Sequence, residues 1–136
     1  MTVHIPFPEL QSLLLAKSKH EISMNYMDEQ TVAVGKTVKF LGLERQLSMK
    51  LYVQEVSGSD IVLAYDDTIF MKSIMKVVEI GFPQLMNLIE MRPPNVVAVH
   101  LDQIDQTKNA LEYVTLNALC FRESGAVVDF SLNMEA

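Results

Sequence analysis

Apolar and polar residues alternate through much of the first half of the chain, which is the period-two pattern of half-buried β-strands. The alternation predicts a meander of about four strands with one shared apolar face, at 22–26, 32–40, 47–53 and 61–65. Polar turn residues and the Leu41-Gly42-Leu43 corner separate these strands. The polar residues of the same strands, such as Lys39 and Lys50, are expected on the outer face.

The segment 69–91 has a different pattern, because its apolar residues cover most of the circumference of a helix. A helix of this kind is covered on several sides, so we expect the flanking strands to wrap around it. Asp66 or Asp67 would provide its N-cap. Gly81 and Pro83 predict a kink or two abutting helices, because proline lacks the amide donor and clashes with the preceding turn.

Shorter elements flank the meander and the central helix. Residues 2–5 predict an edge strand, and residues 8–19 predict an N-terminal helix that buries Leu10, Leu13 and Leu14. After Pro93 and Pro94, the pattern predicts a strand at 96–101, a short helix from Asp102 or Asp105 to Val114, and a hairpin formed by 116–121 and 126–132. The predicted fold is α+β: a curved antiparallel sheet wrapped around a long, kinked apolar helix, with an N-terminal helix and a short C-terminal helix.

Length and composition indicate one globular domain, covering residues 1–136. Apolar residues make up 49% of the chain and charged residues 21%, which is too apolar for a disordered protein. The net charge is −6, and residues 51–136 hold five Lys and Arg against twelve Asp and Glu. Nucleic acid is therefore not expected as a partner, because its phosphates require clustered cations.

Two features bear on the compartment. Cys120 is the single cysteine, so an internal disulfide is excluded, which fits a reducing compartment or indifference to redox conditions. No basic segment followed by an apolar stretch stands at the start, so we expect a cytoplasmic protein, or an envelope protein whose signal was removed. No transmembrane segment is expected, because Lys72, Lys76, Glu79 and Pro83 interrupt the longest apolar stretch.

The order of these elements resembles that of the small bacterial members of the tubular lipid-binding superfamily, in which a highly curved sheet wraps a long helix. The resemblance covers nearly the whole chain and rests on element order. Its residues are the opening PFPELQSLLLAK, the hairpins of SMKLYVQEVSGSDIVLAY, the central apolar helix, and the ending VVAVHLDQIDQTKNALEYVTLNALCFRESGAVVDFSL. The resemblance implies that an acyl chain or another apolar ligand lies between sheet and helix.

The nine methionines of the chain agree with that implication, because unbranched thioethers repack around ligands of varying shape. We therefore expect a non-enzymatic binding protein that holds a lipid-like or other apolar molecule between the inner face of the meander and the central helix. The candidate ligand-binding residues are Phe70, Met71, Ile74, Met75, Phe82 and Met86. The plainer interpretation is that these side chains fill an ordinary core.

The alternative function is that of an interaction or scaffold protein with a solid core. Such a protein would pair with another protein or form a homodimer through an exposed strand edge or through the apolar corner at Leu41-Gly42-Leu43. The cations Lys36, Lys39, Arg45 and Lys50 are expected on a solvated face. Their alternative role is a contact patch for an acidic partner or a lipid headgroup.

No sequence motif indicates catalysis or a cofactor. His4, His20 and His100 are far apart in sequence, and no spacing of zinc ligands is present. His100 and Asp102 would share a strand face, which permits a His-carboxylate site, although a structural hydrogen bond is the simpler interpretation. We therefore expect no enzymatic activity, no metal site and no cofactor.

The cysteine and the paired aspartates also have structural interpretations. Cys120 is expected to be a small buried hydrophobe in a strand. Asp66 and Asp67 are expected to begin a helix and not to form an acid/base pair.

Overall fold

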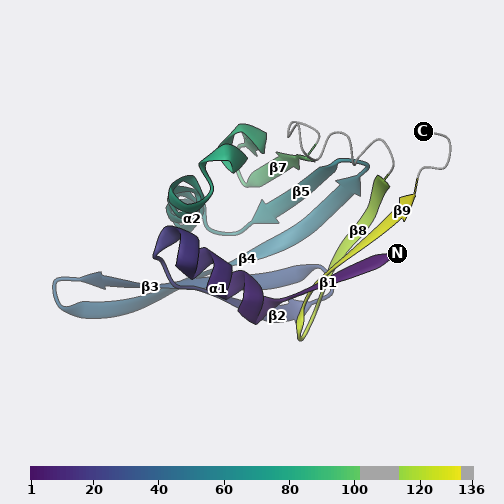
Figure 1. Cartoon of the computed structure of the whole chain (residues 1–136). Helices are drawn as coiled ribbons and strands as arrows, with labels where there is room; N and C mark the ends of the chain where they lie inside the picture. Colours follow the sequence, from purple (N-terminus) through teal and green to yellow (C-terminus); the bar gives the residue numbers. More distant parts are fainter. Residues whose placement is uncertain (102–113, 133–136) are drawn as a thin grey trace.

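A computed structural model describes residues 1–101 and 114–132, apart from the side chains of Val38 and Phe40. Within these residues the strands form two antiparallel sheets (Figure 1). The larger sheet has the order β2 (Ile22–Asp28), β3 (Thr31–Phe40), β4 (Leu43–Ser57), β5 (Asp60–Tyr65), β7 (Val96–His100), β6 (Ile89–Arg92). The smaller sheet has the order β1 (Thr2–Pro6), β9 (Gly125–Leu132), β8 (Val114–Arg122). The helices are α1 (Phe7–Ser18), α2 (Thr68–Gly81) and the short 3₁₀ helix η1 (Pro83–Leu88).

Several predicted elements are confirmed. The four-strand meander is β2 to β5, and each strand pairs with the next in antiparallel register. The C-terminal hairpin is β8 and β9, and the N-terminal helix is α1, although Leu13 is exposed and not buried as expected. Asp67 is the N-cap of α2, and its Oδ1 accepts a hydrogen bond from the Phe70 amide at 2.9 Å. The predicted helix between Asp102 and Val114 lies outside the described residues, except that Val114 begins β8.

The prediction of a long, kinked central helix is wrong, and the predicted fold class is wrong with it. The α-helix within 69–91 ends at Gly81, and the chain continues as the short 3₁₀ helix η1 and then as strand β6. Proline at 83 cannot continue an α-helix, and the apolar residues after it are used in a sheet edge beside β7. Nor is the helix enclosed, because the exposed fractions of Ile69 and Ile80 are 83% and 58%. The protein is mostly sheet, with short helices covering part of one sheet face.

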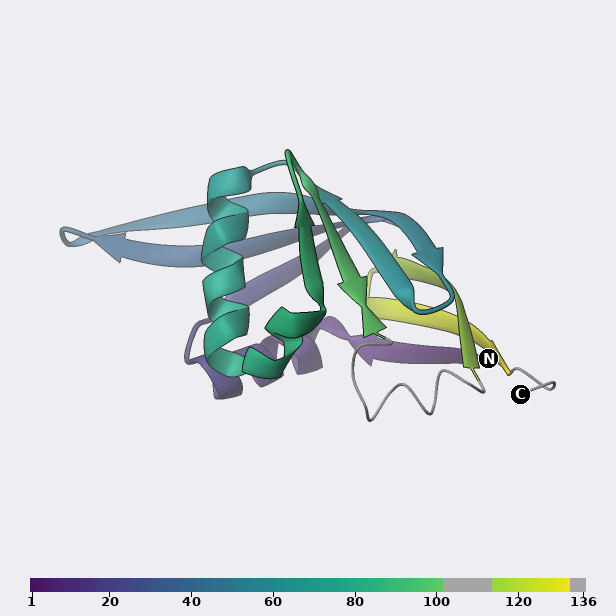
Figure 2. The same cartoon turned by 90° about the horizontal axis from the view of Figure 1, so that it is seen from above.

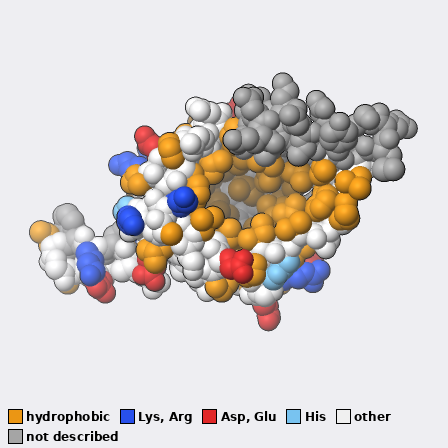
Figure 3. Space-filling model, in the orientation of Figure 1, with side chains coloured by type: hydrophobic (Ala, Val, Ile, Leu, Met, Phe, Trp, Pro, Cys, Tyr) orange, Lys and Arg blue, Asp and Glu red, His pale blue; other side chains and the backbone are white. Residues whose placement is uncertain are grey.

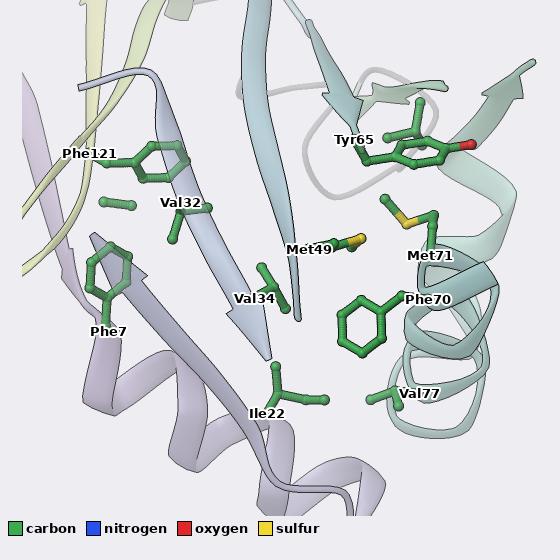
Figure 4. Packing of buried hydrophobic residues seen from close by; sticks show 12 residues of the cluster. Phe7, Ile22, Val32, Val34, Met49, Tyr65, Phe70, Met71, Val77 and Phe121 are labelled. Carbon is green, nitrogen blue, oxygen red and sulfur yellow. The ribbon is translucent and has the colours of Figure 1, made fainter. Parts of the chain in front are cut away.

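The core lies where the helices cover the larger sheet. Phe70 of α2 points toward Met49, Val34 and Ile22 of the sheet (Figure 4). Each of these four side chains is buried. The helix α2 crosses the strands of the sheet, and α1 packs against both α2 and β2 (Figure 2). The helices therefore cover only the part of the sheet face that carries Met49, Val34 and Ile22.

The smaller sheet is joined to the larger one at its strand ends. The Phe121 amide of β8 donates to the Glu29 carbonyl at 2.8 Å, and the Leu116 amide donates to the Gly58 carbonyl at 3.0 Å. The rings of Phe7 and Phe121 add an aromatic contact, with centroids 6.4 Å apart. The two sheets thus form a bent layer whose inner faces meet near Phe121.

A close backbone approach holds β1 against β9. Gly125 pairs with Pro6, and a Cβ at position 125 would overlap the Ile5 carbonyl and the Pro6 Cα. Glycine at this position is therefore required by space and lets β1 pair along β9.

Candidate functional site

The inner face of the larger sheet is apolar well beyond the area that the helices cover. Directly paired residues of antiparallel strands project to the same face, so the strand registers define this face. Val53 pairs with Leu63, Leu63 pairs with Val97, and Ile61 pairs with Val99. All of these positions are apolar, and they continue the face that carries Met49.

Burial divides this face into two parts. Under the helices, side chains such as Met49 and Tyr65 are buried, with exposed fractions of 2% and 3%. Toward the turn between β4 and β5, Val53, Leu63 and Val99 are only half-buried, although they have the same orientation and chemistry. The second part of the face is therefore apolar surface without full cover from the described residues.

The inner face of the smaller sheet is apolar as well. Leu119 pairs with Val128, and Phe121 pairs with Ala126. Phe121 and Ala126 are buried where the two sheets meet, whereas Leu119 and Val128 are half-buried. On the smaller sheet, exposure thus increases with distance from Phe121.

The strands that carry these half-buried positions border a hollow. The space-filling view shows a concavity whose visible wall is largely hydrophobic, over β4 and β5 and between the helices and β8 (Figure 3). We name it the apolar hollow, and the strand registers give as its candidate lining the half-buried inner-face residues of both sheets: Val53, Ile61, Leu63, Val99, Leu119 and Val128. An apolar concave surface is the usual form of a small-molecule site.

The predicted ligand-binding residues are mainly part of the core. Phe70 and Met71 are buried, and Met71 lies beside Tyr65 (Figure 4). Ile74 and Met75 are half-buried and pack against the same core cluster. The structure therefore brings four of the six predicted residues together, in a packed region beside the hollow.

The other two predicted residues lie at the end of α2. Phe82 is the C-cap of α2, and Met86 belongs to η1; both are half-buried. The alternation in the strands already indicated the inner-face positions of β4 and β5. No local pattern indicated that β8 and β9 would face them.

A charged cluster lies on the opposite face of the larger sheet. His100 Nδ1 is 2.9 Å from Asp60 Oδ1, and His100 Nε2 is 2.9 Å from Glu90 Oε2. Arg92 also forms an ion pair with Glu90, in which Nη2 of Arg92 lies 2.8 Å from Oε2 of Glu90. His100 follows Ala98 in the alternation, so the cluster and the apolar hollow are on different faces.

The hydrogen bonds in this cluster shift two pKa values. The bond to Asp60, followed by the bond to Glu90, raises the pKa of His100 above its ordinary value of 6.5. The bond to His100, followed by the bond to Arg92, lowers the pKa of Glu90 below 4.5. When His100 is protonated, both of its ring N–H groups donate to carboxylates, so the cluster connects β5, β7 and β6. Asp102, the expected partner of His100, lies outside the described residues.

Of the remaining candidate groups, the paired aspartates have structural roles. Asp67 caps α2, and Asp66 Oδ1 accepts a hydrogen bond from the Lys50 amide at 2.8 Å. Cys120 is half-buried and pairs with Val127 on the face of the smaller sheet opposite to Phe121. In residues 1–101 and 114–132, no group of three His, Cys, Asp or Glu side chains is arranged to hold a metal ion.

The outer face of the larger sheet has a shallow groove of about 330 Å³. It crosses β2, β3 and β4 and is lined by Ser23, Asn25, Ala33, Val34, Gly35, Gln46 and Ser48. The polar residues among them, Ser23, Asn25, Gln46 and Ser48, offer hydroxyl and amide groups. None of the lining residues is ionisable, so the groove has no evident acid, base or metal ligand.

Comparisons with known proteins provide no further assignment. No protein-family model, no curated protein and no solved structure matches the chain. The resemblance to the tubular lipid-binding superfamily therefore stays a prediction. Of the helices in the described part of the chain, none combines the length and the apolarity that crossing a bilayer requires.

Proposed function

We propose that the protein is a non-enzymatic binding protein that holds an apolar small molecule in the apolar hollow. One observation carries this proposal: strands of two different sheets, whose inner-face residues such as Leu63 and Leu119 are apolar and half-buried, border one concavity. A ligand there would remove apolar surface from water, which is worth about 25 cal/mol per Å². The apolar hollow differs from the site that the sequence predicted, because that site needed a long central helix and the chain does not form one.

The chemistry of the wall favours a ligand without charge. The inner-face positions of β4 beyond Met49, and those of β5, β8 and β9, are apolar in the described residues. A charged group facing them would lose hydration without gaining a partner. The ionisable cluster around His100 is on the other face of the sheet and offers no such partner. The absence of enzymatic activity stays a prediction.

The test uses a neutral fluorescent hydrocarbon, 1,6-diphenylhexatriene, as the probe. We expect it to bind the wild-type protein, and we expect Leu63→Lys to weaken binding at least about tenfold by placing an ammonium in the wall. The matched control is Leu13→Lys, because Leu13 is exposed on α1 with a fraction of 46%. This control should bind the probe as the wild type does.

A second variant protects the test against misfolding. Val53→Thr keeps the side-chain shape and adds one hydroxyl group to the wall, so it should fold and bind the probe less tightly than the wild type. Native mass spectrometry before and after organic extraction checks for a bound apolar molecule. If the probe binds neither the wild type nor Leu13→Lys, or binds all variants equally, the proposal is wrong.

A further inference from the structure

The hairpin of β3 and β4 extends beyond the rest of the larger sheet. Strand β2 pairs with β3 only as far as Lys36, so residues 37–46 form a two-stranded ribbon with the turn at Leu41 and Gly42. Figure 2 shows this ribbon projecting from the body of the molecule. We name residues 36–46 the arm. The two-stranded part of β3 is about 13 Å long at roughly 3.3 Å per residue.

The tip of the arm is apolar and exposed to an unusual degree. The exposed fractions of Leu41 and Leu43 are 86% and 70%, and Leu41 has the highest value among the exposed large hydrophobic residues of the described chain. Nothing within the described chain covers these side chains. A pair of adjacent exposed leucines at the end of a projecting ribbon is a typical feature of a contact site.

The turn at the tip has a cost in local backbone energy. Leu41 and Gly42 have φ values of 52° and 78°, which is the pattern of a type I′ two-residue turn. Such turns favour Asn-Gly, because Cβ crowds the following carbonyl oxygen in the left-handed region and the short polar side chain of asparagine offsets this with local hydrogen bonds. The chain thus has a leucine where asparagine would be more stable, and within the described residues this leucine makes no compensating contact.

Cations are interleaved with the leucines. The arm has three cationic side chains, Lys36, Lys39 and Arg45, against one carboxylate, Glu44, whereas the whole chain has a net charge of −6. Leu43, Arg45 and Leu47 follow one another along one face of β4. Lys36 pairs with Leu47 and therefore projects to the same face.

On the other face of the arm, Nζ of Lys39 lies 3.4 Å from Oε1 of Glu44. Both side chains are mostly exposed, so this ion pair is weak and Lys39 can still contact an anion. The cationic character of the arm therefore remains available to a partner.

From this arrangement we propose that the arm docks on an anionic lipid bilayer surface, with Leu41 and Leu43 inserted among the headgroups and acyl chains. Lys36, Lys39 and Arg45 then contact lipid phosphates and carboxylates. Apolar side chains at a tip with cations directly behind them match the polarity gradient of that interface. The acidic body does not prevent docking, because the ribbon is longer than the screening length of about 10 Å at 0.1 M salt. The inference rests on the arm alone and does not require a ligand in the apolar hollow.

The test is flotation of the full chain with vesicles of phosphatidylcholine mixed with phosphatidylserine, and with vesicles of phosphatidylcholine alone. The wild type should float with the mixed vesicles and only weakly with the neutral ones. Leu41→Asn should bind at least about tenfold more weakly, because it removes an inserted leucine. The same variant should unfold at a higher temperature than the wild type, because Asn-Gly suits the turn. Loss of binding therefore cannot be attributed to misfolding.

Matched variants separate the tip from its cations. Ile69→Asn removes an exposed apolar side chain from α2 and should leave flotation unchanged. Arg45→Gln should weaken binding about fivefold and reduce its salt dependence, whereas Lys72→Gln, an equal charge change on α2, should not.

Three results would overturn the proposal. The first is that the wild type does not float with either kind of vesicle, which is also what we expect if the arm binds an acidic protein and not a bilayer. The second is equal flotation of the wild type and Leu41→Asn. The third is a wild-type dimer in light scattering that Leu41→Asn converts to a monomer, together with no vesicle binding, which would assign the tip to a second copy of the chain.

Discussion

The inner face of the larger sheet has two parts that differ in cover but not in composition. Beneath α2, Met49 and Tyr65 are buried in the same core cluster as Phe70. Toward the turn between β4 and β5, Val53 and Leu63 have the same orientation but remain half-buried beside the apolar hollow. Apolar alternation therefore indicates which side of a strand avoids water, and the neighbouring elements decide whether that side becomes core or binding surface.

The largest expected effect is in the covered part. Phe70→Ala should lower the free energy of unfolding by about 3–5 kcal/mol, because it removes a buried ring and leaves a cavity. Chemical denaturation measures this loss. The adjacent Ile69→Ala is the control and should change stability by less than about 0.5 kcal/mol, because Ile69 is 83% exposed. Similar losses for both variants would contradict the position of the core.

A somewhat smaller effect is expected where the smaller sheet is assembled. Gly125→Ala should destabilise the protein by more than about 2 kcal/mol, because the new methyl group meets the backbone of Ile5 and Pro6. Hydrogen exchange of the β1 amides should increase at the same time. Gly35→Ala is the comparison, since its methyl group meets the hydroxyl of Ser23, which can rotate away. Equal losses would show that β1 is not held by this close approach.

The open part of the face should tolerate truncation better. Leu63→Ala should cost about 1 kcal/mol, well below the cost of truncating Phe70, because Leu63 is only half-buried and leaves no closed cavity. Denaturation in the presence and absence of diphenylhexatriene extends the comparison. The probe should raise the unfolding midpoint of the wild type more than that of Leu63→Ala. A loss as large as that of Phe70→Ala would mean that this part is core.

The smallest effect is expected from the charged cluster on the outer face. The raised pKa of His100 means that its contribution to stability is complete below the unfolded pKa of about 6.5 and is lost as the pH rises through the folded pKa. The lowered pKa of Glu90 has the opposite consequence, with a contribution present above about 4.5 and lost as the pH falls through the folded pKa. The cluster is partly exposed, so both effects are small.

The measurement for this prediction is the pH dependence of the unfolding midpoint. The wild type should lose stability as the pH rises above about 6.5, relative to His100→Gln, which lacks the titrating imidazole and should not show this loss. Arg92→Gln keeps His100 and should keep the slope. Parallel profiles for the wild type and His100→Gln would show that the cluster does not contribute.

Much of the strand structure was predictable because its signals are local. Alternation identified β2 to β5, and the glycine-containing turn identified the hairpin of β8 and β9. Asp66 or Asp67 was expected as the helix cap, and Asp67 has that role. The error over 69–91 has a physical reason. A continuous apolar stretch is compatible with helix and strand alike, and Pro83 ended the helix instead of kinking it.

The sequence alone determined where the strands of the meander lie and that one of their faces is apolar, because adjacent side chains alternate and turns have specific backbone requirements. Only the tertiary structure decided that β8 and β9 face β4 and β5, and that α2 covers one part of the sheet and not the other. Those arrangements depend on contacts between residues far apart in the chain, such as Phe121 with Glu29, which no local pattern contains. The apolar hollow is a consequence of these long-range contacts.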